Sequence, residues 1–230
     1  MRIAISSSSV SRTTAYLAVL VGVICVYFIV SSFVFPHERT VRNDVVQGIL
    51  IGVGLAFVTA QAYAWITATR VNGWVTMLGL GVPGNGMFLR AAHAQFFPGP
   101  VNVPQEAMYW WTNSDGAGHA LSGQHDYVMH FAAGGLPPND AFWSLTMGDA
   151  RNHFVPNPID RYSVGDRSAL VPDPDGSVDI YIQNTAPGGR EANWLPAPSS
   201  GGFILWLRAY VPGEAVLDGR YTVPPVVKVR

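Results

Sequence analysis

The stretch LPPNDAFWSLTMGDARNHFVPNPIDRYSVGDR, residues 136–167, decides the fold class of this chain. Within it, residues 141–148 alternate between apolar and half-polar side chains, which is the period of a strand with one buried face. We expect the apolar set to face the core: Trp143, Leu145 and Met147. The prolines, glycines and asparagines of residues 149–167 indicate turns and loop after this strand. The stretch therefore predicts a mainly β, antiparallel domain.

Short apolar runs separated by turn residues continue through residues 105–230 and predict a β-sandwich. Strands are expected at residues 107–112, 125–131, 141–148, 168–171, 178–183, 203–211 and 226–230. The last is expected at a sheet edge, because Pro224 and Pro225 precede it. The segment Asp173-Pro-Asp-Gly-Ser predicts a hairpin turn between the fourth and fifth strands.

Two long uncharged stretches, residues 13–35 and 45–69, predict membrane-spanning helices. About 20 helical residues cross a hydrocarbon core of about 30 Å, and both stretches are longer. The connector of residues 36–44 is short, so the helices would form an antiparallel transmembrane hairpin. For the first stretch a cleaved signal peptide is the alternative, although residues 33–36 (Phe-Val-Phe-Pro) are not the small residues that precede a cleavage point.

The predicted organisation is an N-terminal tail (residues 1–12), a transmembrane α-hairpin (13–70), a linker with a short helix (71–104) and the β-sandwich (105–230). Charged residues make up 13% of the chain, against about 25% in a typical soluble protein. The net charge of −1 and the lack of a basic stripe in the sequence argue against nucleic-acid binding. Cys25, the single cysteine, lies in the first apolar stretch, so no disulfide forms within one chain.

Arginine placement bears on the sidedness of the predicted multi-pass arrangement in the cell membrane. Two spans would place both termini on one side. Arg39 and Arg42 crowd the short connector, whereas Arg2, Arg12 and Arg70 flank the other side. Because short cytoplasmic loops are enriched in arginine and lysine, this density slightly favours an extracytoplasmic β domain.

The second apolar stretch carries small residues at every fourth position, which lines them up along one side of a helix. We call this set the small-residue ridge: Gly48, Gly52, Ala56, Ala60 and Ala64. Such a ridge lets another helix backbone approach closely. Either the first helix fills it, using Ala18 and Gly22, or a separate membrane protein docks there. Gln61 favours some partner, because an amide that faces lipid lacks hydrogen bonds.

Several sequence blocks occur in the order of a known family. They are Leu136-Pro-Pro, Phe142-Trp-Ser-Leu-Thr-Met, Asn157-Pro, Arg161-Tyr-Ser-Val-Gly-Asp, Asp175-Gly-Ser, Ile180-Tyr-Ile-Gln, Asn193-Trp-Leu-Pro-Ala-Pro, Leu207-Arg-Ala-Tyr and Leu217-Asp-Gly. From about residue 87 onward the chain resembles the domain of unknown function 1214. The resemblance implies a β-sandwich of jelly-roll character, often behind a membrane anchor, and no accepted reaction or cofactor. The companion domain numbered 1254 has no room here, and the helical hairpin takes its place.

Four charged residues lie beside prolines and glycine, where loops would bring them together: Asp160, Arg161, Asp166 and Arg167. One interpretation is a network of salt bridges and turn caps that fixes loop geometry. The other is a polar pocket, formed with Asp160, that binds a sugar or a lipid at the end of the sandwich. In that pocket Arg161 and Arg208 would bind acidic groups, and Trp194 would offer its ring face.

Metal and cofactor signals are weak. On a strand, Asp126 and His130 would share a face and His125 would take the other, which leaves two ligands where a zinc site normally has three or four. His119 could supply another. The glycine-rich residues 79–86 lack the lysine of a phosphate-binding loop. We therefore expect no metal and no cofactor.

Signals for hydrolysis are equally thin. Ser144 lies in the middle of a predicted strand and not on a strained turn. Carboxylates for acid–base chemistry would come from Asp126, Asp149, Asp160 and Glu191. A hydrolase of unknown substrate stays an alternative without assigned catalytic residues.

The aromatic run Tyr109-Trp110-Trp111 completes the candidate surfaces. In a strand, Tyr109 and Trp111 share one face while Trp110 takes the other, and the exposed face would suit a partner. The leading hypothesis is a non-catalytic accessory subunit of a larger membrane or cell-envelope complex, with a transport complex as one option. It would dock through the small-residue ridge and this aromatic run. The alternative is a sugar- or lipid-binding envelope module.

Overall fold

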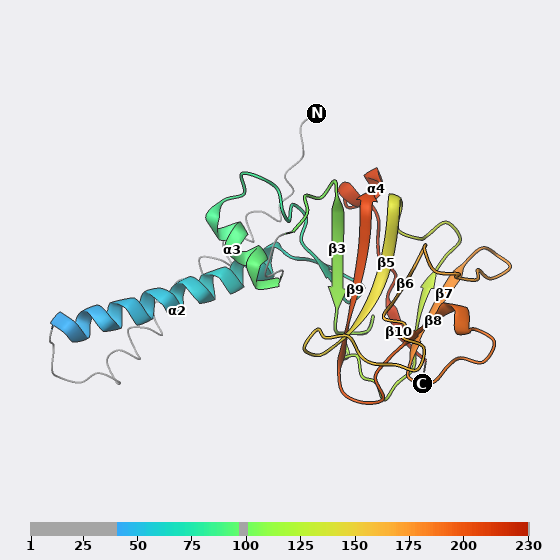
Figure 1. Ribbon diagram of the computed structural model, residues 1–230. Helices are drawn as coiled ribbons and strands as arrows, with labels where there is room; N and C mark the ends of the chain where they lie inside the picture. The colour runs from blue at the N-terminus through green and yellow to red at the C-terminus, as the bar shows by residue number, and fades with distance from the viewer. Residues whose placement is uncertain (1–40, 97–100, 230) are drawn as a thin grey trace. The chain divides into compact units, whose positions relative to one another are not determined.

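The computed structural model describes residues 41–96 and 101–229. They belong to two compact units, one within residues 1–67 and 84–100, the other made of residues 68–83 and 101–230. The first unit is helical and the second is mainly β (Figure 1). The predicted tail and the first predicted membrane helix, residues 13–35, lie outside the described residues.

The helical unit is dominated by α2, Val41–Thr67, which runs for 27 residues. Its segment Val45–Thr67 is long and apolar enough to cross a membrane, and it is the one such helix among the described residues. Large exposed apolar side chains along it are Val45, Val46, Ile49, Leu50, Val53 and Phe57. The predicted short helix is α3, Met87–Phe96, which packs against α2 with the rings of Tyr63 and Phe88 6.4 Å apart. The structure thus describes one of the two expected spans.

The β unit consists of two sheets. In spatial order, the six-stranded sheet holds β1 (Thr69–Val71), β2 (Trp74–Thr76), β3 (Ala107–Thr112), β9 (Phe203–Pro212), β5 (Asn139–Asp149) and β6 (Ser163–Gly165). The four-stranded sheet holds β10 (Val226–Lys228), β4 (Tyr127–Phe131), β7 (Val178–Gln183) and β8 (Trp194–Pro196). The short helices are η1 (Glu191–Asn193) and α4 (Glu214–Leu217). Neighbouring strands are antiparallel except β7 and β8, which are parallel.

The inner faces of the two sheets pack together and form one hydrophobic core. Along β7 and β9 the buried residues alternate with less buried ones, as the sequence pattern predicts, and the inward face of β5 holds the expected Trp143, Leu145 and Met147. The ring of Tyr127 in β4 meets that of Phe203 in β9 edge to face, with centroids 5.8 Å apart. Burying such side chains contributes about 1.5–3 kcal/mol each and holds the sheets together.

The β1–β2 hairpin belongs to the β unit, whereas the sequence places residues 71–104 in a linker. Asn72 and Gly73 have φ of 54° and 83°, which fits a two-residue type I′ turn between strands. The following Trp74 is 1% exposed, and its Nε1 donates a hydrogen bond to the carbonyl oxygen of Pro224 at 2.8 Å. An Asn-Gly pair between apolar residues is a strong hairpin signal, so this hairpin was detectable in the sequence.

The first arm of the predicted hairpin, residues 168–171, is not a strand. The turn itself forms, because the N–H of Asp173 donates to the carbonyl oxygen of Ser177 at 2.8 Å. Beyond the turn, Pro172 offers no N–H to a neighbouring strand. The side chain of Asn193 takes both backbone groups of Val171. β7 pairs with β4 and β8 instead.

β6 is a strand that the sequence pattern does not reveal. Its three residues pair with Ser144, Leu145 and Thr146 of β5. At Gly165 the two backbones approach so closely that an added Cβ would collide with the carbonyl oxygen of Trp143. Only glycine fits there, and the strand is too short for its alternation to be read locally.

Val211, near the end of β9, has φ of 47°, a left-handed conformation that is rare for a β-branched residue. Such strain costs of order 1–3 kcal/mol, and the side chain is 45% exposed, so little burial offsets it. Asparagine tolerates this conformation better. We expect Val211→Asn to raise the free energy of unfolding by about 1 kcal/mol. Urea titration of the full chain in mild detergent, followed by tryptophan fluorescence, measures this.

Val227→Asn is the matched control, because Val227 is 49% exposed and lies in the regular strand β10. No gain in stability is expected from it. An equal gain at both positions would show that surface polarity, and not backbone strain, is responsible.

Candidate functional site

Two predicted binding residues, Arg161 and Trp194, come together but hold the backbone. The guanidinium Nη1 of Arg161 donates to the carbonyl oxygens of Glu191 and Trp194, at 2.7 and 2.8 Å. The indole of Trp194 is 4% exposed, and its Nε1 donates to the carbonyl oxygen of Gln183 at 2.8 Å. Both side chains therefore fasten η1 and the start of β8.

The other two predicted binding residues lie elsewhere. Arg208 is on the outer face of β9, where its Nη1 donates to Oγ1 of Thr146 at 2.9 Å. Asp160 is exposed, has φ of 49° and accepts a hydrogen bond from the hydroxyl of Tyr162 at 3.3 Å. The structure therefore joins Arg161 to Trp194, whereas Arg208 belongs to the outer face of the other sheet.

The loop between β5 and β6 is held by its own polar side chains. Oδ1 of Asn157 accepts from the N–H of Arg161 at 3.0 Å, and its Nδ2 donates to the Arg161 carbonyl oxygen at 2.9 Å. Oδ1 of Asp149 accepts from the N–H groups of Arg151 and His153, at 2.8 and 2.9 Å. These contacts fix the loop geometry, but they are not the predicted salt bridges: among the described residues, no ion pair involves Asp160, Arg161, Asp166 or Arg167.

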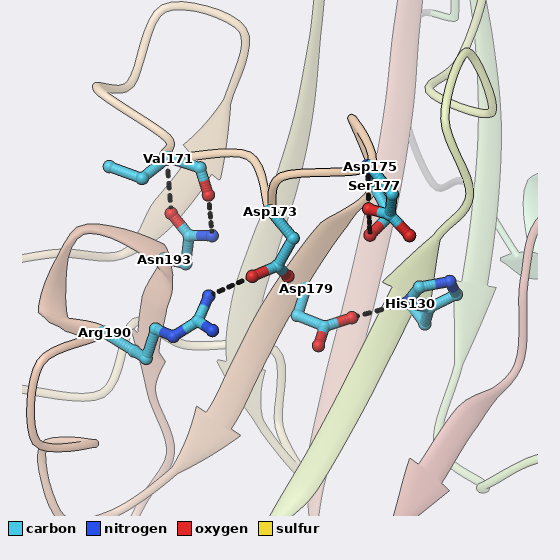
Figure 2. Close-up of polar contacts among 8 residues, drawn as sticks. All are labelled: His130, Val171, Asp173, Asp175, Ser177, Asp179, Arg190 and Asn193. Carbon is cyan, nitrogen blue, oxygen red and sulfur yellow. Dashed lines mark hydrogen bonds and ion pairs between the residues drawn. The ribbon is translucent and has the colours of Figure 1, made fainter.

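A second set of polar contacts joins the loop before β7 to the segment between β7 and β8 (Figure 2). Asn193 is 1% exposed, and its Oδ1 accepts from the N–H of Val171 at 2.7 Å while its Nδ2 donates to the Val171 carbonyl oxygen at 2.8 Å. Arg190 and Asp173 form an ion pair of 2.7 Å. The amide of Asn193 thus takes the place of a neighbouring strand for Val171.

A separate histidine–carboxylate pair joins β4 to β7. Nδ1 of His130 lies 2.6 Å from Oδ1 of Asp179, and the histidine side chain is 58% exposed. The nearby hydroxyl, that of Ser177, donates to Asp175 at 2.6 Å and is not bonded to the imidazole. A nucleophile needs a hydrogen bond to its base, so this cluster lacks the arrangement of a catalytic serine.

The histidines tested for metal binding are dispersed. Nδ1 of His119 lies 3.5 Å from Oδ2 of Asp115, and the ring of His125 contacts that of Tyr127. In residues 41–96 and 101–229, no group of three or more potential ligand side chains gathers at one point.

The outer face of the six-stranded sheet is aromatic. We call the following set the aromatic face: Tyr109, Trp111, Phe142, Trp206, Arg208 and Tyr210. The rings of Phe142 and Tyr210 stack with centroids 4.2 Å apart. The guanidinium of Arg167 lies 3.9 Å from the centroid of Phe142, a cation–π distance.

Of the three residues Tyr109, Trp110 and Trp111, which the sequence predicts to dock a partner, only two lie on the aromatic face. Tyr109 and Trp111 are half-buried there, and the rings of Trp111 and Trp206 lie 6.3 Å apart. Trp110 points the other way and is 6% exposed in the core, so it is not part of an exposed docking surface. The period of two along β3 explains this division.

The small-residue ridge changes character along α2. Gly48, Gly52 and Ala56 are exposed, whereas Ala60 and Ala64 are buried. A Cβ added at Gly48 or Gly52 would meet none of the described atoms within 4 Å. Gln61 is exposed as well.

A pocket of about 80 Å³ opens in the β unit beside the β1–β2 hairpin, and we call it the hairpin pocket. Its lining includes Val71, Trp74, Leu78, Trp110, Val216 and Tyr221. The rings of Trp110 and Tyr221 meet edge to face at 5.9 Å, and burial raises the pKa of Tyr221 above its usual range. The sequence did not predict this pocket, because the residues that line it come from distant parts of the chain, near residues 69–78 and 216–223.

Residues 106–214 match the model of the family described as protein of unknown function (DUF1214). This match confirms the resemblance expected from the sequence blocks. No curated protein matches the chain.

Two solved structures are similar. The VPA0106 protein from Vibrio parahaemolyticus aligns with a TM-score of 0.61 at 23% identity, over 85% of this chain and 47% of that one. An uncharacterized protein from Burkholderia cenocepacia aligns with a TM-score of 0.39 at 20% identity, over 84% of this chain and 46% of that one. The first likeness shows a shared fold. The chain spans about half the length of either protein.

Asn193→Ala should destabilise the protein strongly, because it leaves both backbone groups of Val171 without their partner. We expect the free energy of unfolding to fall by about 2–3 kcal/mol. Urea titration measures this. Asn102→Ala is the control, since Asn102 is exposed and bonds to the exposed groups of Tyr109 and Glu106. Similar losses in both variants would contradict the role given to Asn193.

Two hydrogen-bonded carboxylates, at the end of β5 and in the turn before β7, make stability depend on acid pH. Hydrogen bonds from the N–H groups of His153 and Arg151 hold the pKa of Asp149 below its usual range, and those from Ser177 do the same for the pKa of Asp175. A carboxylate with a lowered folded-state pKa stabilises the fold above its unfolded pKa of about 3.9 and loses this effect as pH falls.

We therefore expect the free energy of unfolding to decline below about pH 4 and to depend little on these groups above about pH 5. Urea titrations between pH 3 and pH 7 measure it. The double variant Asp149→Asn/Asp175→Asn should make the decline less steep, while Asp115 and Asp218, whose pKa values are also lowered, keep part of it. An unchanged slope would contradict the assignment.

Proposed function

We propose that this chain, whose residues 106–214 form a domain of the DUF1214 family, is a membrane-anchored interaction module of a larger membrane or cell-envelope complex. In this proposal a two-helix hairpin holds the protein in the membrane, and a jelly-roll-like sandwich stands outside the cytoplasm. The chain contributes binding surfaces and not a reaction. The observation that carries the proposal is the exposed, uncharged segment of α2 with its small-residue ridge.

The surface of α2 favours a hydrocarbon environment. Its apolar segment of 23 residues extends about 35 Å at 1.5 Å per residue, enough for a hydrocarbon core of about 30 Å. Ile49, Leu50 and Val53 are each more than 60% exposed. Exposing such a side chain to water costs about 25 cal/mol of free energy per Å² of apolar surface, and this cost disappears when the side chain faces lipid.

The open part of the ridge supports a helical partner. At Gly48 and Gly52 a neighbouring helix backbone can approach without meeting a side chain. Two occupants fit this geometry: the first predicted helix, through Ala18 and Gly22, and a helix of another membrane protein. The proposal takes the second as the docking mode, and the experiment below separates the two.

The polar side chains of the β unit also favour binding over catalysis. Arg161 is bonded to backbone carbonyl oxygens, Asn193 to Val171, and Arg190 to Asp173. These groups stabilise loops and are not arranged around a common space. What the domain offers a partner is therefore its surfaces: the aromatic face, including Tyr109 and Trp111, and the hairpin pocket.

Gly52→Leu tests the docking mode. A leucine at this position fills the open part of the ridge, so we expect the partner that co-purifies in mild detergent to be lost. Gly54→Leu is the matched control: Gly54 also has open space among the described atoms but lies two residues on, on the opposite side of α2. Both changes improve helix propensity by about 0.8–1 kcal/mol, so helix stability does not distinguish them.

Size-exclusion chromatography with mass spectrometry of the co-purified proteins provides the measurement. A monodisperse wild-type monomer without a stable partner would count against the proposal. If Gly52→Leu lowers the thermal stability of the isolated chain but leaves the partner bound, the first predicted helix occupies the ridge and docking there is wrong.

A further inference from the structure

We propose that the hairpin pocket receives one aliphatic side chain, of the size of valine, leucine, isoleucine or methionine, from a protein partner. This inference rests on the proposed function, because it requires a protein partner. It adds a contact in the β unit that is independent of the small-residue ridge.

The volume of the pocket selects the class of side chain. An apolar cavity of about 150 Å³ holds one benzene molecule, which has six carbons. The hairpin pocket, at about 80 Å³, has roughly half that volume. It therefore takes about three or four carbons, which corresponds to one aliphatic side chain. A phenylalanine ring or an indole is too large.

The lining is already organised for an apolar group. Trp74 donates its Nε1 hydrogen bond to Pro224, and Oγ1 of Thr76 donates to the carbonyl oxygen of Tyr109 at 2.7 Å. Trp110 packs against Tyr221, whose hydroxyl donates to the carbonyl oxygen of Gly135 at 3.3 Å. These polar atoms have protein partners, so the walls present mainly carbon. Side chains held in this way lose little conformational freedom when a ligand enters.

The mouth of the pocket is apolar as well. Two lining residues, Val71 and Leu78, are 43% and 47% exposed. An anchoring side chain would bury its own surface and part of theirs together. Side chains that fill such desolvated pockets supply much of the free energy of protein association.

A membrane lipid is a poorer occupant than a protein side chain. The carbons of an acyl chain already lie in hydrocarbon, so moving them into the pocket removes about as much apolar contact as it adds. A side chain exposed to water on a partner gains the hydrophobic free energy in full. The observations therefore favour a protein with an exposed aliphatic anchor.

Site-specific photocrosslinking of the full chain in its native membrane tests the inference. Benzoylphenylalanine replaces Arg220, which is exposed and lies between the lining residues Gly219 and Tyr221 without lining the pocket itself, and ultraviolet light joins it to a neighbouring C–H group. We expect the main adduct on a valine, leucine, isoleucine or methionine of a second protein, located by tandem mass spectrometry. The same probe at Tyr181, on the outer side of β7, should not give that adduct.

A pocket-blocking variant provides the second measurement. Thr69 lines the pocket and is exposed at the edge of β1. The ring of Thr69→Phe is too large to enter the pocket and blocks its entrance, so the partner loses the burial of about three carbons and we expect roughly 50-fold weaker association with a corresponding loss of the adduct. Thr69→Val keeps the shape and should retain the adduct. Thr69→Leu, which blocks less, should fall between them, and equal thermal unfolding midpoints confirm that the variants fold.

Each contrary outcome is distinct. Adducts on lipid chains or on this chain itself overturn the inference, as does an adduct yield that Thr69→Phe leaves unchanged. If Gly52→Leu still removes the partner in that case, the proposed function stands without the pocket. If the wild-type chain has no partner by either measurement, both fail.

Discussion

The connection from β7 to β8 depends on the amide of Asn193. Parallel neighbours usually need a crossover of a dozen or more residues, yet residues 184–193 alone join these two strands. Asn193 holds the end of this connection to Val171, and Arg161 holds the carbonyl oxygens on either side. Because these groups are bonded, β8 can close the sheet and bury Leu195 in the core.

Several family blocks contain these same residues. Asn193 and Trp194 belong to one block, Arg161 to another and Asn157 to a third, and in each case the side chain bonds to backbone. A pattern made of loop-holding residues identifies a fold without identifying a reaction. This explains why the family match, the shared fold of the Vibrio protein and the proposed interaction role are compatible.

The parts of the fold that were predictable are those whose signal is local. Alternation along β3, β5, β7 and β9 reveals each strand and its buried face, and Trp110 follows the same rule. The first arm of the expected hairpin failed because a buried side chain far along the chain, Asn193, determines the conformation at Val171. The hairpin pocket has no local signal at all, since Trp74 meets Pro224 across 150 residues. Arg161 does lie beside Trp194, but its bond to the backbone there could not be read from the sequence.

The core of the β unit extends beyond the segment that the family model covers. β1, β2 and β10 all lie outside residues 106–214, and so do the buried Trp74, Val223 and Val226. A fragment trimmed to residues 106–214 would expose the edges of β3 and β4 together with uncovered apolar surface, which is the kind of edge that promotes aggregation. A fragment that keeps the whole β core therefore has to start near residue 68 and keep the C-terminal strand.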